Sequence, residues 1–160
     1  MIMTEVGLEK HLEDNQVWHR FIDKQETIHT ADAARAAGVE LHRLTKNLVS
    51  KTDREEVVLL VVPGNRKVDL KSAAKALSAR RVHLVSFAEA EEISGYPPGA
   101  TPSIGHKTVM RTVIDRSLLE HETIYCGGGS RDRLVELKTK DIIRLSNAII
   151  ADISKSVAEN

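Results

Sequence analysis

The chain has 160 residues, of which 41% are hydrophobic and 3% aromatic, and its 23 Lys and Arg are balanced by 23 Asp and Glu. This size predicts one compact domain over residues 1–160 with an aliphatic core, burying about two-thirds of the unfolded surface. The neutral balance excludes a strongly basic packaging protein, so an RNA ligand would have to meet a local patch.

The chain has a single cysteine, Cys126, and no apolar run of 18 residues. One cysteine excludes an intramolecular disulfide and favours a reducing compartment. The first residues show no signal-peptide pattern. We therefore expect a cytoplasmic protein with no membrane partner.

Capping residues and hydrophobic periodicity predict the elements of the first half. Thr4 and Thr30 are predicted N-caps, and Gly38 is expected to end the second helix. The expected elements are a helix from Thr4 to Asn15, a strand over 17–22, a helix over 31–37, a helical turn over 40–44 and a strand over 45–50.

In the second half, residues 56–62 are nearly all apolar and predict a central strand covered on both faces. Asp69 and Thr139 are predicted N-caps, and Ser86 with Glu89 forms a predicted capping box for a helix that Gly95 ends. The expected elements are a helix over 69–78, strands over 82–85, 109–115, 123–126 and 134–137, a helix over 139–146 and a strand over 148–153. This irregular alternation favours an α+β fold with a mixed β-sheet, curled toward a barrel, and peripheral helices.

Lys46 opens an apolar, β-prone stretch directly after a predicted helical turn. A lone ammonium at such a position is expensive to bury unless something anionic meets it. Two glycine-rich segments, residues 95–105 and 126–130, are candidates for the walls of the cavity that it faces. The combination predicts a site for a charged, phosphate-bearing substrate.

Each glycine-rich segment has two interpretations. The triplet Gly127–Gly129 suits a flexible hairpin turn, or a backbone whose N–H groups bind an anion or a polarised carbonyl. The segment 95–105 suits a surface loop, or a pocket wall stiffened by Pro97 and Pro98.

Other candidate catalytic residues are weak. Cys126 ends an apolar strand with no histidine near it in sequence, so a buried core thiol is favoured over a nucleophile. The seven histidines form no pair with metal-ligand spacing, which predicts no metal site and no cofactor. His29 and His106 remain candidates for substrate contacts.

The order and spacing of these pieces resemble the YbaK/prolyl-tRNA synthetase-associated editing domain family over about residues 27–153. The pieces that carry the resemblance are His29–Ala34, Thr45–Val49, Val68–Lys71, Ser94–Gly99, Thr112–Asp115, Tyr125–Gly129 and Ala151–Ile153. The resemblance implies trans-editing, the hydrolysis of the ester that joins a wrong amino acid to a tRNA 3′ end.

The resemblance also implies site residues and partners. Lys46 matches the functional lysine of the family. The substrate pocket is expected to include Asn47, Thr30, Gly99, Thr101, Ser103, Gly127, Gly128, Gly129 and Ser130. The expected partners are the 3′ end of a mischarged aminoacyl-tRNA and a prolyl-tRNA synthetase.

The sequence leaves the amino acid open between cysteine and alanine. Asn47, directly after the lysine, resembles members that clear alanine from proline tRNA, whereas residues 125–130 resemble the cysteine-clearing branch. Ala100 stands where many members have a second glycine.

We expect a protonated Lys46 to bind a phosphate or the ester carbonyl, and Asn47 or a nearby main-chain carbonyl to hold the amino group or water. N–H groups of Gly127–Ser130 would stabilise the oxyanion, and a substrate thiol is a possible nucleophile. The alternative is a non-catalytic module that binds an aminoacyl-adenylate, an amino acid or a tRNA 3′ end.

Overall fold

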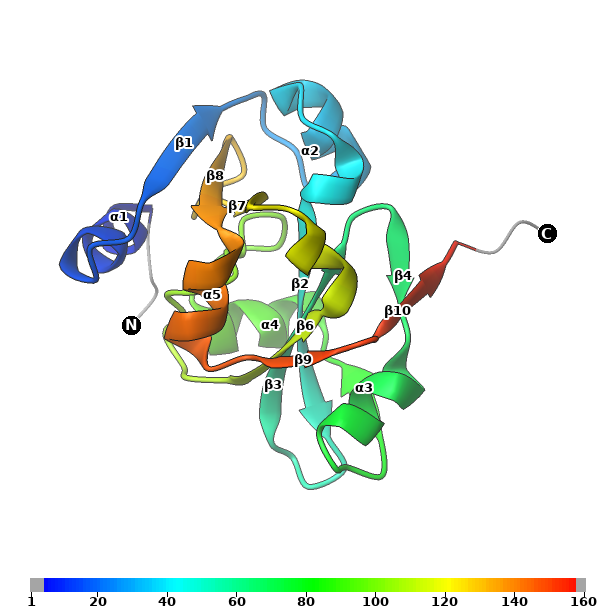
Figure 1. Cartoon of the computed structure of the whole chain (residues 1–160). Helices are drawn as coiled ribbons and strands as arrows, with labels where there is room; N and C mark the ends of the chain where they lie inside the picture. Colours follow the sequence, from blue (N-terminus) through cyan, green and yellow to red (C-terminus); the bar gives the residue numbers. More distant parts are fainter. Residues whose placement is uncertain (1–4, 158–160) are drawn as a thin grey trace.

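A computed structural model describes residues 5–157 (Figure 1). Its elements in chain order are α1 (Glu5–Asp14), β1 (His19–Asp23), α2 (Thr30–Ala37), the 3₁₀ turn η1 (Leu41–Arg43), β2 (Thr45–Thr52), β3 (Val57–Pro63), β4 (Arg66–Val68), α3 (Leu70–Ala76), β5 (Val82–Leu84), α4 (Phe87–Ser94), β6 (Arg111–Asp115), η2 (Arg116–Glu120), β7 (Thr123–Gly127), β8 (Arg133–Lys138), α5 (Thr139–Ser146), β9 (Ile149–Ala151) and β10 (Ser154–Ser156).

The strands of residues 5–157 form three sheets. The largest has the order β5-β2-β3-β6-β9 and is mixed, because β2 is antiparallel to β3 and β5 whereas β6 is parallel to β3 and β9. The other two are the antiparallel sheet β1-β8-β7 and the two-stranded ribbon β10-β4. The α+β prediction is confirmed. Within the described residues no sheet closes into a barrel, so the expected barrel-like curl is not confirmed.

β3 lies at the centre of the core, with Val58 to Val62 fully buried. Leu59 and Val61 pack in a cluster with residues of α1, α5 and the β1-β8-β7 sheet, whereas Val58, Leu60 and Val62 pack against α3. Alternate residues of one strand thus fill both layers, which confirms the predicted central strand covered on both faces.

Several helix caps and helix ends are present where the sequence predicted them. The Asp69 side chain accepts a hydrogen bond from the Ser72 N–H at 3.2 Å, and Gly38 ends α2 in the left-handed conformation at φ 70°. The Ser86 hydroxyl accepts from the Glu89 N–H. The return bond of the capping box is replaced, because the Glu89 carboxylate pairs with Lys51 of β2.

Other predictions need correction. Thr30 and Thr139 are each the first residue of their helix, with no side-chain cap at the preceding residue, and Thr4 lies outside the described residues. The strand expected from residue 17 begins at His19, because the Val17 N–H bonds to Leu12 at the end of α1. β4 and β10 were not predicted. Their residues are mostly Arg, Lys and Ser, and the two strands pair only with each other.

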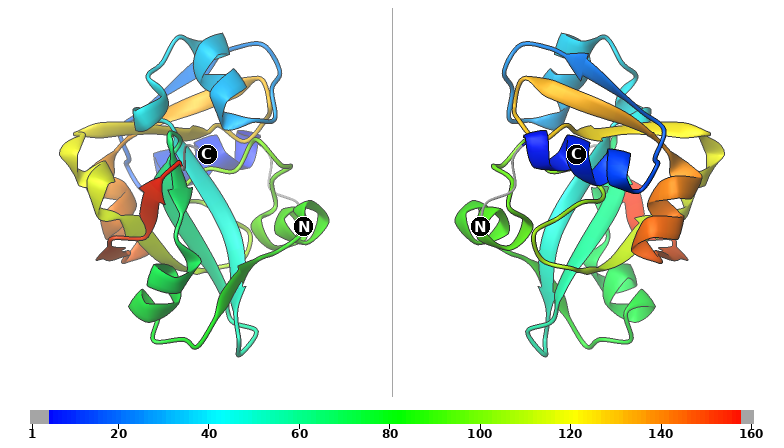
Figure 2. Two further views of the ribbon diagram at one scale, coloured as in Figure 1. Left: turned by 90° about the vertical axis from the view of Figure 1, so that its right-hand side faces the viewer. Right: turned by 90° about the vertical axis from the view of Figure 1, so that its left-hand side faces the viewer.

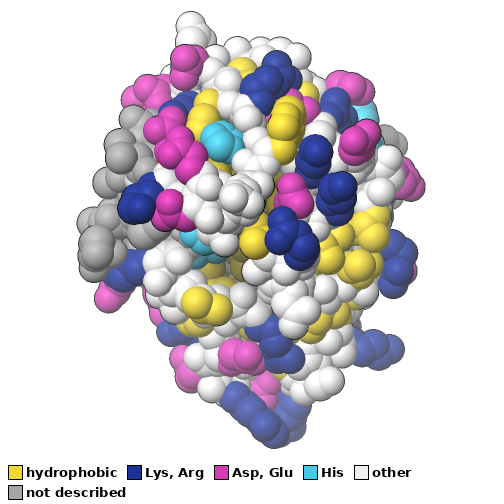
Figure 3. Space-filling view, turned by 60° about the vertical axis from the view of Figure 1, so that its left-hand side comes forward, with side chains coloured by type: hydrophobic (Ala, Val, Ile, Leu, Met, Phe, Trp, Pro, Cys, Tyr) yellow, Lys and Arg dark blue, Asp and Glu magenta, His cyan; other side chains and the backbone are white. Residues whose placement is uncertain are grey.

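The surface reflects the balanced composition. On the face shown in Figure 3, Lys and Arg side chains are interspersed with Asp and Glu rather than gathered on one side. No helix between residues 5 and 157 has the length and apolar character needed to span a membrane.

Candidate active site

A cavity of about 250 Å³ lies along β2, where α2, α4 and the segment 96–101 surround it. Figure 2 (left) shows β2 with α4 on one side and the β4–β10 ribbon on the other. The polar side chains of the lining are His29, Thr30, Thr45, Lys46, Asn47 and Thr101. The remaining lining residues are Ile28, Ala33, Leu44, Leu48, Val49, Leu84, Val85, Phe87, Ala90, Tyr96, Pro98, Gly99, Gly127 and Leu134.

β2 presents an open main-chain edge to this cavity. β5 pairs only with Ser50–Thr52, and the Val85 N–H extends the contact by one bond to the Val49 carbonyl at 3.2 Å. Since the main-chain groups of alternate strand residues point the same way, those of Asn47 face the same edge as those of Val49. The N–H and carbonyl of Asn47 therefore face the cavity, where no described strand pairs with them.

Lys46 is one of the lining residues, and its side chain is half-buried. Its Nζ donates to the main-chain carbonyl of Arg66 in β4. Burial lowers the pKa of Lys46, and no carboxylate of residues 5–157 forms an ion pair with it. A dipole thus holds the ammonium in place without neutralising its charge, which leaves it able to attract an anion.

The amide of Asn47 is oriented by hydrogen bonds at both ends. Its Nδ2 donates to Thr45 Oγ1 at 2.8 Å, and its Oδ1 accepts from Ser103 Oγ at 2.6 Å. Thr45 Oγ1 in turn donates to the Tyr125 carbonyl at 3.0 Å. The second Nδ2 hydrogen has no partner among the described residues, so Asn47 offers one oriented side-chain donor.

The structure gathers six of the ten predicted site residues around the cavity. Those that line it are Thr30, Lys46, Asn47, Gly99, Thr101 and Gly127. Those that it places outside the lining are Ser103, Gly128, Gly129 and Ser130. Ser103 is buried and supports Asn47 instead. A direct contact between Ser103 and substrate stays a prediction.

The glycine triplet does not supply the predicted oxyanion donors. The N–H groups of Gly127, Gly128 and Gly129 already bond to the carbonyls of Thr101, Arg133 and Ala100 at 3.2, 3.0 and 3.1 Å. For these three donors the prediction is wrong.

The triplet instead permits close packing of two loops. A Cβ on Gly127 would lie 2.3 Å from the carbonyl carbon of Ala100, and a Cβ on Gly128 would lie 2.7 Å from Arg133. Ala100 is itself fully buried and lies outside the cavity lining, so this departure from the family pattern bears on loop packing.

Cys126 and His106 are structural. Cys126 is buried, its pKa is raised to about 11 by burial, and its sulfur accepts the Ser103 N–H, which confirms the predicted core thiol. His106 bonds to the Pro102 carbonyl, lies outside the cavity lining, and has its pKa lowered to about 4 by burial. His29 lines the cavity, and its contact with substrate stays a prediction.

An apolar rim that was not predicted from the sequence surrounds the cavity and is formed by Ile28, Leu84 and Phe87. Their exposed fractions are 45%, 44% and 67%, and all three line the cavity. Leu84 ends β5 and Phe87 begins α4 three positions later, whereas Ile28 comes from the distant segment before α2. Tyr96 shapes the adjoining wall by donating its hydroxyl to the Gly105 carbonyl at 2.6 Å.

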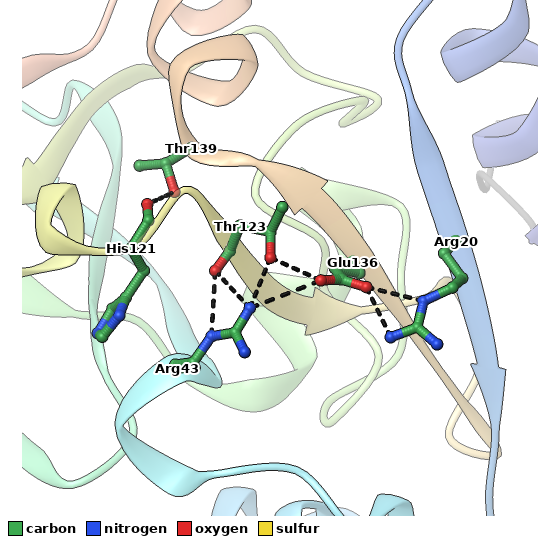
Figure 4. A network of polar contacts seen from close by, with 6 residues as sticks. All are labelled: Arg20, Arg43, His121, Thr123, Glu136 and Thr139. Carbon is green, nitrogen blue, oxygen red and sulfur yellow. Dashed lines mark hydrogen bonds and ion pairs between the residues drawn. The ribbon is translucent and has the colours of Figure 1, made fainter.

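A polar network supports the chain that leads into β2 (Figure 4). The buried Glu136 of β8 pairs with Arg20 of β1 at 2.7 Å and with Arg43 of η1 at 3.5 Å, and it accepts from Thr123 at 2.6 Å. Burial alone would raise the pKa of Glu136, but these hydrogen bonds and charges outweigh it and lower the pKa. Because η1 directly precedes β2, the network helps to fix the cavity strand.

The mixed α+β fold and the sequence together define the family of this chain. Residues 25–145 match the family model described as an aminoacyl-tRNA editing domain. The chain belongs to this family, which confirms the resemblance seen in the sequence. The activity that this family indicates is that of an aminoacyl-tRNA deacylase, a hydrolase of the aminoacyl ester.

Three relatives show the extent of the likeness. EbsC of Enterococcus faecalis, named as a candidate Cys-tRNA(Pro)/Cys-tRNA(Cys) deacylase, is 28% identical over 136 residues, 85% of this chain and 83% of its own. The multifunctional Ser/Thr-tRNA deacylase ProXp-y of Escherichia coli K12 is 27% identical over 144 residues, 88% of this chain and 83% of its own. The crystal structure of the hypothetical protein APE2540 has a TM-score of 0.86 at 27% identity, covering 93% of this chain and 99% of that one.

Proposed function

We propose that the protein edits mischarged tRNA in trans by hydrolysing the aminoacyl ester in the cavity along β2. The observation that supports particular residues is Lys46, a half-buried lining residue whose ammonium forms no ion pair with a described carboxylate. A tRNA 3′ end supplies the anion that such a group attracts.

Asn47 is proposed to hold the reacting group. Its main-chain carbonyl, on the open edge of β2, suits the α-amino group of the substrate. Its N–H and its free Nδ2 hydrogen suit the developing oxyanion, a role worth about 3–4 kcal/mol for one well-placed donor. These donors take the role that the sequence predicted for the N–H groups of Gly127, Gly128 and Gly129, which are occupied.

The apolar rim is proposed to hold the terminal adenine. The adenosine is attached directly to the ester, so it must lie at the mouth of whichever cavity holds the amino acid. A nucleobase stacked on an aromatic side chain gains about 1–3 kcal/mol, and Phe87 is the exposed aromatic at this mouth.

Water or a substrate group is proposed as the nucleophile. The ester is already activated, and Cys126 is buried with a raised pKa, which makes it a poor nucleophile. With cysteine as the amino acid, its own thiol would attack the carbonyl and displace the tRNA 3′-hydroxyl, and water would then hydrolyse the resulting cyclic thioester to free cysteine.

The cavity fits a small amino acid, because its volume of about 250 Å³ lies below the roughly 300–1,000 Å³ of most ligand pockets. We propose cysteine or alanine on proline tRNA as the first substrates to try. A synthetase pocket rejects such residues poorly, since one methylene is worth only about 1–3 kcal/mol. The tRNA would come from a prolyl-tRNA synthetase in the cytoplasm. Serine- and threonine-charged tRNA belong in the same panel, given the name of ProXp-y.

The test is deacylation by Lys46→Ala. We expect kcat/KM on the best substrate of the panel to fall about 100-fold or more, with the thermal unfolding temperature retained. Lys51→Ala is the matched control, because Lys51 lies on the same strand but pairs with Glu89 instead of lining the cavity. Full activity of Lys46→Ala would refute the proposed site.

A further inference from the structure

The ribbon formed by β4 and β10 carries two lysines directly opposite each other. Lys67 pairs with Lys155 in the antiparallel register, and both are exposed. Like charges at directly opposed positions destabilise a strand pair. Neither lysine forms an ion pair with a carboxylate in the part of the chain that the structure describes. The facing acid is Asp69, whose carboxylate is occupied as the N-cap of α3 and whose pKa is lowered chiefly by Ser72 and to a smaller extent by Lys155.

The ribbon is joined to the cavity through Lys46. The carbonyl that holds the Lys46 ammonium belongs to Arg66, a ribbon residue. The Arg66 side chain ties the ribbon together, since its Nε donates to Ser154 Oγ at 2.7 Å. Lys46 thus stands between the cavity and the ribbon, which lies beside β2 away from α4 (Figure 2, left).

We propose that the β4–β10 ribbon binds backbone phosphates of the tRNA acceptor end, with Lys67 and Lys155 as the contacts. The inference rests on the proposed function, because the ester in the cavity fixes where the preceding nucleotides begin. A phosphate held by each of the two opposed lysines would offset their mutual repulsion. Such contacts position the strand and carry no sequence information.

The test compares two substrates of the double variant Lys67→Ala/Lys155→Ala. Each phosphate contact to a single strand contributes a slope of about 0.7 in log affinity against log salt. Between 50 and 200 mM salt, kcat/KM on mischarged tRNA should therefore fall about sevenfold more for the wild type than for the double variant. On an aminoacyl-adenosine ester, which has no phosphate, the two proteins should be equal.

Lys107→Ala/Lys140→Ala is the matched control, since both lysines are exposed and lie outside the ribbon. In this control, kcat/KM on mischarged tRNA should depend on salt concentration as steeply as in the wild type. An unchanged slope for Lys67→Ala/Lys155→Ala would overturn the inference and leave the lysines as a guard against edge-to-edge strand pairing. Failure of the wild type to hydrolyse either substrate would instead sink the proposed function.

The variant Lys155→Glu distinguishes a role of the ribbon in tRNA binding from a role in the stability of the fold. It places opposite charges across the ribbon, so the unfolding temperature should stay the same or rise while kcat/KM on tRNA falls. A lower unfolding temperature together with an equal loss on the adenosine ester would show a structural role and overturn the inference.

Discussion

Asn47 owes its orientation to a residue that does not line the cavity. Ser103 Oγ donates to its Oδ1 at 2.6 Å, which directs the amide nitrogen toward Thr45 and the cavity. Without this donor the amide can rotate, and the oriented hydrogen is lost.

Ser103→Ala should therefore lower kcat/KM about tenfold, which corresponds to one hydrogen bond of about 1.4 kcal/mol. Ser50→Ala is the control, because Ser50 is also buried but bonds to the Leu48 carbonyl within β2. Equal activities of the two variants in a steady-state deacylation assay would contradict the positioning role of Ser103.

Lys46 makes the activity depend on pH in a defined direction. Burial lowers its pKa, so the ammonium is fully present below this lowered value and is lost as the pH rises through it. The KM for tRNA should rise on the alkaline side, at a lower pH than an ordinary lysine would give.

The stability of the fold should change in the opposite sense. In the interval between the lowered pKa of Lys46 and its value in the unfolded chain, the unfolded state binds more protons, so stability rises with pH. Lys46→Met should remove both effects. A wild-type KM that stays flat to high pH, after subtraction of spontaneous ester hydrolysis, would contradict this role.

At the scale of elements, the end of β7 packs against the loop at residues 100–101 so closely that only glycine fits. In Gly127→Ala the new methyl group would lie 2.3 Å from the Ala100 carbonyl carbon. The two loops must separate, which should lower the free energy of unfolding by about 1–3 kcal/mol and widen the cavity.

Gly38→Ala tests whether this loss is steric. Gly38 has nothing within 4 Å of a Cβ, so its replacement meets only the left-handed backbone cost of about 1–2 kcal/mol. Urea unfolding measures both variants, and deacylation should fall in Gly127→Ala but not in Gly38→Ala. Retention of wild-type activity by Gly127→Ala would show that the cavity tolerates the shift.

At the scale of the whole molecule, Glu136 couples the β1-β8-β7 sheet to the chain entering β2. Its pKa is lowered from the ordinary value of 4.5, so its contribution to stability is present above that value and is lost as the pH falls through the lowered pKa. Glu136→Gln should lower the free energy of unfolding by about 1–2 kcal/mol at pH 7. This value is kept small because Arg20 is exposed and solvent screens its attraction to Glu136.

The difference between Glu136→Gln and the wild type should shrink as the pH falls below 4.5. Glu56→Gln is the control, because its pair with Arg111 is exposed on both sides and should contribute little. Urea midpoints measured at several pH values check both variants. A difference that is constant with pH would contradict the charged role of Glu136.

Much of the fold followed from local chemistry. The Asp69 cap, the Gly38 stop and the apolar β3 depend on a few neighbouring residues, so the sequence reveals them. β4 and β10 escaped prediction because their polar residues become strands only through a partner about 90 positions away.

Some features of the candidate site were likewise predictable from the sequence, whereas others depend on the tertiary structure. The sequence by itself determined the family, the position of Lys46 and the two glycine-rich segments, because these depend on residue type and order. Only the tertiary structure decided which hydrogen-bonding groups remain available: the N–H groups of Gly127 and Gly129 bond to carbonyls of the distant segment 100–101, whereas the edge at Asn47 is open. The physical reason is that a donor's availability depends on its partner, and these partners come from elsewhere in the chain.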